Sequence, residues 1–236
     1  MRPRSGGLGH GVRCVSTRIR LRRGWRMHDA WELAGQARRD FADVAEQLDE
    51  VQWDTETLCS GWTSHHVLAH LVWHIEQTVP ALLVALTRAR FDFNRAADRA
   101  ARELAKRPSQ ELLTELRERA DEKPSVPGAP ETGSVTDTVI HIQDVRRACG
   151  LDGTLNPEFV RVGLDFLTTH RNARFIFNPK VLAGLSLNAT DVDWTFGSGP
   201  EIKGPGEALM MAIVGRPTRS ELDGDGLALL ADRLDN

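Results

Sequence analysis

Apolar residues in the first 150 positions recur with the three- and four-residue spacing of amphipathic helices. This spacing predicts a first helix over residues 29–50 and a second over 64–88. Pro80 is expected to kink or interrupt the second helix, because proline lacks a backbone N–H donor. A third helical stretch is predicted over 93–122, with a break at Pro108. The N-terminal half of the chain is therefore predicted to be helical.

A fourth helix follows a loop that the sequence marks clearly. Prolines and glycines are concentrated in residues 123–133, which predicts a loop. The next helix is predicted over 134–149, and Gly150 is its expected C-terminal stop. Four helices joined by connections of this kind favour a helical bundle.

The pattern changes after Gly150, where helical and strand-like periods are mixed. A helix is predicted over 157–174, and further helices over 206–214 and 227–234. Between them, apolar residues alternate with polar ones, which indicates strands with one buried face. The alternating residues are Leu185, Leu187, Ala189, Val192, Trp194 and Phe196.

These elements predict a mainly α protein with a small α+β domain at its C-terminal end. The bundle is assigned to residues 28–152 and the α+β domain to 153–236. Residues 1–27 are expected to form an arginine-rich extension without a fold of its own. Residues 1–26 hold eight arginines and no acid, so the remainder has 22 basic against 33 acidic residues and a net charge of −11. An acidic body of this kind does not favour nucleic-acid binding.

The cysteines and the apolar runs limit the cellular setting. Cys14, Cys59 and Cys149 are odd in number and form no CxxC pair, so neither a disulfide framework nor a cysteine-based zinc site is expected. No cysteine is expected to serve the chemistry. No apolar run approaches 18 residues, so no membrane span is predicted. We expect a cytoplasmic protein that is a monomer or a homodimer.

Three residues form the candidate metal site. Asp137 and His141 lie four positions apart, which places both side chains on one face of the fourth predicted helix. His70 lies on the second predicted helix. If the two helices pack side by side, two imidazoles and one carboxylate meet at a divalent metal and leave coordination positions open. We therefore expect the three ligand atoms to converge within about 4 Å of one another.

Simpler interpretations of these residues remain open. His66, His70 and His74 share one helix face, which is also the pattern of a solvated polar face or of a site made by His66 and His70 alone. Asp137 lies in the first turn of the predicted helix, where an acid complements the helix dipole. The pair Asp137 and His141 is equally compatible with a local hydrogen bond.

Three longer motifs resemble one protein family. They are residues 57–63 (Thr-Leu-Cys-Ser-Gly-Trp-Thr) followed by Ala69-His70-Leu71, the spacing Asp137-x3-His141-x2-Asp144-x2-Arg147-Ala148-x-Gly150, and a run from Ala189 to Trp194 followed by Gly204-Pro205 and Gly215-Arg216. In this order they resemble the DinB-like, mycothiol-dependent maleylpyruvate isomerase family over about residues 28–236.

The resemblance implies a divalent metal, zinc in the family, held at the positions of His70, Asp137 and His141. The family carries Glu where this chain has Asp137, and the shorter side chain needs closer helices or a bridging water. Asp144 is expected to accept the second ring N–H of His141, or else to pair with an adjacent arginine. The resemblance also implies that Arg216 recognises a substrate or thiol, although a cation at a helix end would serve as well.

The implied function is a metal- and mycothiol-dependent isomerisation. An external thiolate would add to an activated cis double bond, the resulting single bond would rotate, and the thiolate would leave. Transfer of mycothiol to an electrophile for detoxification needs the same site, so the two activities stay open. A non-catalytic module that binds metal or thiol is the further alternative. The expected partners are a low-molecular-weight thiol and a small-molecule substrate, with neither nucleic acid nor membrane.

Overall fold

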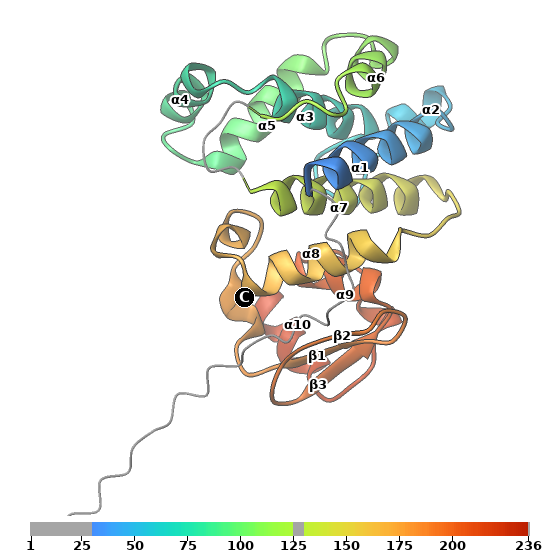
Figure 1. The fold of residues 1–236 in the computed structure, drawn as a ribbon, viewed down its shortest axis with the longest axis vertical. Helices are drawn as coiled ribbons and strands as arrows, with labels where there is room; N and C mark the ends of the chain where they lie inside the picture. Colours follow the sequence, from blue (N-terminus) through green and yellow to red (C-terminus); the bar gives the residue numbers. More distant parts are fainter. Residues whose placement is uncertain (1–29, 125–129, 236) are drawn as a thin grey trace, which may run out of the picture.

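The computed structural model describes residues 30–124 and 130–235, so the arginine-rich segment 1–27 lies outside the described residues. The chain forms a helical bundle followed by a region in which helices pack on a small sheet (Figure 1). The elements, in order, are α1 (Ala30–Ala45), α2 (Glu50–Trp53), α3 (Ser64–Glu76), α4 (Val79–Arg88), α5 (Phe93–Leu104), α6 (Ser109–Glu118), α7 (Glu131–Cys149), α8 (Pro157–Thr169), η1 (Arg171–Phe175), η2 (Pro179–Leu182), β1 (Ser186–Ala189), β2 (Trp194–Gly197), β3 (Glu201–Gly204), α9 (Gly206–Ile213), η3 (Arg219–Glu221) and α10 (Leu227–Asp235). The predicted fold class is confirmed. Among the described residues, no helix is both long and apolar enough to cross a bilayer.

One predicted helix is shorter than expected, and another is interrupted as predicted. The first ends at Ala45, and Asp49 begins α2 by accepting a hydrogen bond from the backbone N–H of Gln52. The interruption predicted at Pro80 is confirmed, because the second helix is divided into α3 and α4, with Pro80 in the first turn of α4. Proline is well tolerated at that position because the backbone N–H groups of the first turn have no partner within the helix. Local caps therefore ended helices that the apolar pattern alone would have continued.

The helix that carries Asp137 and His141 begins earlier than expected, at Glu131 instead of residue 134. Asp137 consequently lies in the second turn of α7, and its interaction with the helix dipole is weaker than a first-turn position would allow. Gly150 ends α7 as predicted, with a left-handed φ of 66° that suits glycine. The predicted break at Pro108 also holds, because Pro108 immediately precedes α6.

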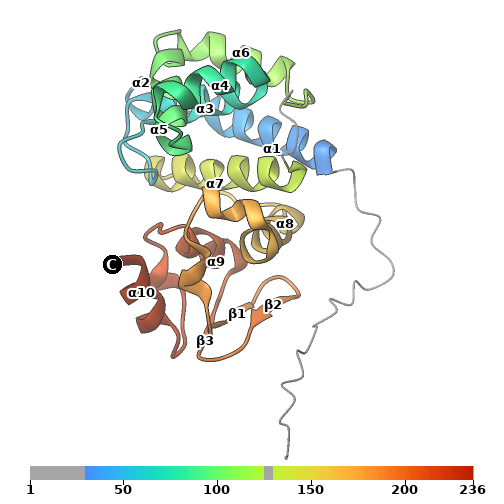
Figure 2. The same cartoon turned by 90° about the vertical axis from the view of Figure 1, so that its left-hand side faces the viewer.

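The sheet has three strands in the order β2-β1-β3. Strand β1 pairs antiparallel with β2 and parallel with β3, with Leu187 opposite both Phe196 and Ile202. Strand β3 was not predicted, because Ile202 supplies its only large apolar side chain and one such residue cannot establish a two-residue period. Figure 2 shows the sheet on the far side of α8 and α9 from the bundle.

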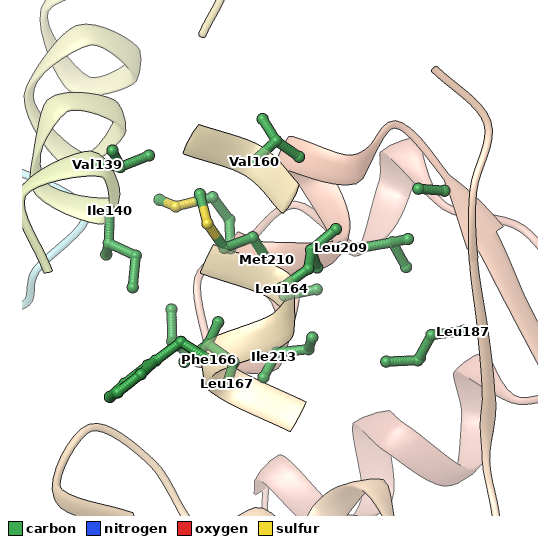
Figure 3. Close-up of a cluster of buried hydrophobic side chains, with 14 of the residues drawn as sticks. Val139, Ile140, Val160, Leu164, Phe166, Leu167, Leu187, Leu209, Met210 and Ile213 are labelled. Atoms are coloured by element: carbon green, nitrogen blue, oxygen red, sulfur yellow. The ribbon is translucent and has the colours of Figure 1, made fainter. Parts of the chain in front are cut away.

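Helix α7 is buried on two opposite faces, because it lies between two hydrophobic cores. Ile142 and Val145 belong to the core of the bundle, which α1, α3 and α6 also line. Val139 and Ile140 face α8 and α9, where Leu164 is fully buried (Figure 3). Polar side chains on such a helix are removed from water, and this is the setting of Asp137 and His141. The boundary proposed near residue 152 stays a prediction.

Candidate metal centre

His70, Asp137 and His141 come together between α3 and α7. A capping box at Thr63 begins α3, with Thr63 and His66 exchanging hydrogen bonds, so the ring of His66 is engaged at the helix start. The next turn carries His70 towards α7. His70 Nε2 lies 3.3 Å from Asp137 Oδ2, and His141 Nε2 lies 3.8 Å from Asp137 Oδ1. The three ligand atoms all lie within 4.8 Å of one another, a spacing somewhat wider than the expected 4 Å.

The carboxylate of Asp137 reaches the imidazoles directly. Four donors about 2.05 Å from a tetrahedral zinc are about 3.3 Å apart, which is close to the separation of His70 and Asp137. Helices α3 and α7 therefore lie close enough together for aspartate, although it is shorter than glutamate, to reach His70. Asp137 Oδ2 is buried and accepts no hydrogen bond from any described residue. A buried acceptor without a hydrogen bond is costly, and a cation would satisfy it.

The protonation states suit a cation. Burial raises the pKa of Asp137, but the neighbouring imidazoles, with His70 first, outweigh burial and hold its pKa below the usual range. Burial also lowers the pKa of His70, against the attraction of Asp137. Near neutral pH the cluster therefore presents an ionised carboxylate and a neutral imidazole, which are the forms that bind a divalent metal.

His74 is a further imidazole at the site that the sequence analysis left on a polar face. Its Nδ1 lies 3.6 Å from Asp137 Oδ2, one helical turn beyond His70. Its Nε2 is buried and has no hydrogen-bond partner among the described residues. Burial, followed by the charge of His70, lowers the pKa of His74 to about 3, so its ring stays neutral. The four-residue spacing from His70 was the signal that could have identified it.

Asp144 fixes the orientation of His141. Its Oδ2 lies 3.0 Å from His141 Nδ1, so an N–H at Nδ1 leaves Nε2 free to face Asp137. Asp144 also accepts hydrogen bonds of 2.8 Å from Arg216 Nε and Nη2. Arg147 instead pairs with Glu207 and Glu221. It is therefore not the adjacent arginine that the alternative interpretation paired with Asp144.

Arg216 thus links the C-terminal region to the bundle. Its guanidinium pairs with the fully buried carboxylate of Asp144. Burial raises the pKa of Asp144, but the hydrogen bonds from Arg216 and His141 outweigh burial and hold this pKa below its ordinary value. A third nitrogen, Nη1, lies 3.4 Å from the carbonyl of Val214. The role of Arg216 in binding substrate stays a prediction, since all three of its guanidinium nitrogens already donate hydrogen bonds within the protein.

Cys59 lies beside the site, contrary to the expectation that no cysteine is well placed. Ligand atoms of Cys59, His141 and Asp144 lie within 4.8 Å of one another. Burial raises the pKa of Cys59 to about 11, despite the nearby Arg216. At neutral pH Cys59 is therefore a thiol and a weak nucleophile. Its position could not be predicted, because it lies in a loop before α3.

Aromatic rings enclose the histidines. The ring of Trp62 is 4.9 Å from that of His70 and stacks on His141 at 5.8 Å, measured between ring centroids. Trp62 Nε1 donates to Asp98 at 2.9 Å, which fixes the indole in place. The imidazoles are consequently held by packing as well as by hydrogen bonds.

Comparisons with known proteins address the family. Residues 34–125 match the family described as the mycothiol maleylpyruvate isomerase N-terminal domain. No curated protein gives a significant match to the chain. A crystal structure of the mycothiol-dependent maleylpyruvate isomerase is similar with a TM-score of 0.52, and a histidine-to-alanine mutant of the mycothiol-dependent maleylpyruvate isomerase with a TM-score of 0.57.

Each of these structures is 14% identical to this chain and aligns over 83% of this chain and 91% of its own. At this identity the likeness is one of fold, and it extends beyond the bundle into the C-terminal region. The match over 34–125 adds evidence from the sequence itself. The family resemblance inferred from the motifs is therefore confirmed: residues 34–125 match the mycothiol maleylpyruvate isomerase N-terminal domain family, and the likeness of fold extends over most of the chain.

Proposed function

We propose that the chain is a metal- and thiol-dependent enzyme of the maleylpyruvate isomerase type, with His70, Asp137 and His141 as ligands of one divalent metal. The observation that carries this proposal is the half-buried Asp137 carboxylate, which faces three imidazoles while its buried Oδ2 accepts no hydrogen bond from a described residue. Two nitrogens and one oxygen suit zinc, and three protein ligands are typical of a catalytic site with an open position.

A bound zinc would act as a Lewis acid and lower the pKa of a thiol, which yields thiolate near neutral pH. The residues of the chain prepare this site. Asp144 holds the His141 ring so that Nε2 is available, and Arg216 keeps Asp144 ionised in its buried position. Trp62 shields one side of the two imidazoles from water.

The thiol in this proposal comes from outside the chain, and mycothiol is the candidate that the family suggests. The protonated state of Cys59 supports an external thiol, because its own pKa of about 11 makes it a poor nucleophile. In the isomerisation, the external thiolate adds to an activated cis double bond, rotation about the new single bond follows, and the thiolate leaves with its electron pair. The same thiolate would serve a transferase. Placement in the cytoplasm belongs to the same proposal.

Elemental analysis of the purified protein together with a mycothiol titration tests the proposal. We expect about one zinc per chain and saturable thiol binding, both lost in His141→Ala. The matched control is His66→Ala, which removes a histidine of the same helix that caps α3 instead of facing Asp137. A folded wild-type protein that takes up no divalent metal, or equal metal loss in both variants, contradicts the proposal.

A further inference from the structure

A cavity apart from the proposed metal centre lies between α1, α7 and the segment that follows α7. Its volume is about 240 Å³. Helices α1 and α7 pack against each other (Figures 1 and 2), and α7 contributes Ile142 and Arg146 to the cavity. These two residues lie about 100° around the helix from Asp137 and His141, because each of them is one position further along. The cavity therefore shares a helix with the metal cluster but none of its proposed ligands.

Arg146 is a buried cation that lines this cavity without a partner. It is 5% exposed, yet its guanidinium makes no hydrogen bond or ion pair with any residue in 30–124 or 130–235. The guanidinium packs directly against Gly153, where an added Cβ would overlap with Arg146 Nη2. This packing holds the cation in place but does not offset its charge. Burying an unpaired charge is unfavourable, and a guanidinium is suited to bidentate binding of a carboxylate.

Three acids line the same cavity, Asp40, Asp43 and Asp152, and none of them forms an ion pair with Arg146. Asp43 is engaged elsewhere, since Arg117 Nη2 lies 2.8 Å from its Oδ1. Asp152 has no partner within the described parts of the chain. Burial raises the pKa of Asp40, so water alone solvates this carboxylate poorly. Asp40 and Asp152 are therefore the acids in the cavity that a bound cation would stabilise.

The charges of the cavity select the kind of occupant. A metal ion does not suit these acids, because the described residues bring three possible ligand atoms within 4.8 Å of one another only in groups that contain His141. An anion alone would be repelled by Asp40 and Asp152. A cation alone would be repelled by Arg146 and would leave that guanidinium unpaired. A zwitterion offsets charges of both signs at once.

Size and apolar walls narrow the choice further. Val44, Ile142 and Leu155 line the cavity between the charged groups, and Ile142 is fully buried. The volume is below the range of about 300–1,000 Å³ that is typical of drug-sized ligands, so the occupant is small. A molecule of this size with two opposite charges and an apolar side chain has the chemistry of an aliphatic α-amino acid.

We infer that this cavity binds a small aliphatic α-amino acid, with its carboxylate on Arg146 and its ammonium group at Asp40 and Asp152. The side chain of the ligand packs against Ile142. This site is distinct from the metal centre and does not depend on the proposed function.

Isothermal titration calorimetry of the full chain with L-valine tests the inference. Isovalerate lacks the ammonium group of valine and isobutylamine lacks its carboxylate, so the two analogues separate the charges. We expect one L-valine per chain with a Kd of about 1 mM or lower. Each analogue should bind at least about tenfold more weakly, because each loses its hydrogen bonds to a charged partner. Absence of L-valine binding, or equal binding of either analogue or of glycerol, overturns the inference.

Two variants assign the binding to the cavity. Arg146→Gln should raise the Kd of L-valine at least about tenfold. Arg39→Gln is the matched control and should leave the Kd unchanged, because Arg39 is a partly exposed residue of α1 that pairs with Asp121 outside the cavity. Asp152→Asn alters an exposed loop residue and is expected to fold even if Arg146→Gln does not. It should raise the Kd about two- to fivefold, the range of an exposed ion pair, without weakening isovalerate. An unchanged Kd in either cavity variant contradicts the assignment.

The metal centre must be separated from this site, because amino acids also chelate zinc. The titrations are therefore made with zinc-supplemented and with chelator-treated protein, and the Kd of L-valine should be the same in both. Loss of valine binding after chelation would place the ligand at the metal centre and overturn the inference. Failure of the proposed function looks different: elemental analysis finds no metal, while L-valine still binds and Arg146→Gln still weakens it.

Discussion

Replacing Arg216 by glutamine should destabilise the protein strongly, because it leaves a buried charge unpaired. The carboxylate of Asp144 is completely inaccessible and receives two hydrogen bonds of 2.8 Å from Arg216. Hydrogen bonds to charged groups contribute about 1.5–3 kcal/mol each. Breaking one side of a buried ion pair costs about 3–5 kcal/mol. With His141 as the remaining partner of Asp144, we expect a loss of about 3–5 kcal/mol in the free energy of unfolding.

Urea unfolding followed by circular dichroism measures this loss in the metal-free protein, so that metal affinity does not enter. Asp144→Asn and the double variant complete a double-mutant cycle. Once Asp144 carries no charge, Arg216→Gln should cost clearly less than it does alone. A loss below about 1 kcal/mol in Arg216→Gln, or strictly additive effects in the cycle, would refute the view that this pair holds the C-terminal region against the bundle.

Three further predictions concern other parts of the chain. The pKa of His74 is about 3 in the folded protein, below its ordinary value of 6.5, so the unfolded state binds more protons between these two pH values. In chelator-treated protein, the free energy of unfolding should therefore fall as the pH drops from 6.5 towards 3, by up to about 1.4 kcal/mol per pH unit. Urea titrations measure this slope, and His74→Gln should flatten it. Gly150→Ala should cost about 1 kcal/mol in the same assay, since no atom lies within 4 Å of an added Cβ and only the positive φ opposes it; a neutral result would refute the strain argument. Leu164→Ala should lower the free energy of unfolding by about 2–5 kcal/mol, seen as a lower Tm, because Leu164 is fully buried beside α7. A loss below about 1 kcal/mol would mean that neighbouring side chains repack into the cavity.

The helical period predicted α3, α5, α6 and α7 because each helix has an apolar stripe that the core requires. It failed at helix ends that depend on single side chains. Asp49 and Thr78 each accept a backbone hydrogen bond that starts a new helix, and such caps compete with an apolar pattern that continues through them. Strand β3 was missed for the opposite reason: it is held by pairing with β1 more than by its own sequence.

The sequence by itself determined which side chains share a helix face, and so it placed Asp137 with His141 and aligned His70 with His74. Helix geometry makes that inference local. Only the tertiary structure decided what those faces meet. The packing of α3 on α7 put the imidazoles around one carboxylate, and the C-terminal region delivered Arg216 to Asp144 and Phe175 to Phe93. Contacts between residues this far apart in the sequence depend on how the cores pack, and no periodicity within one helix encodes them.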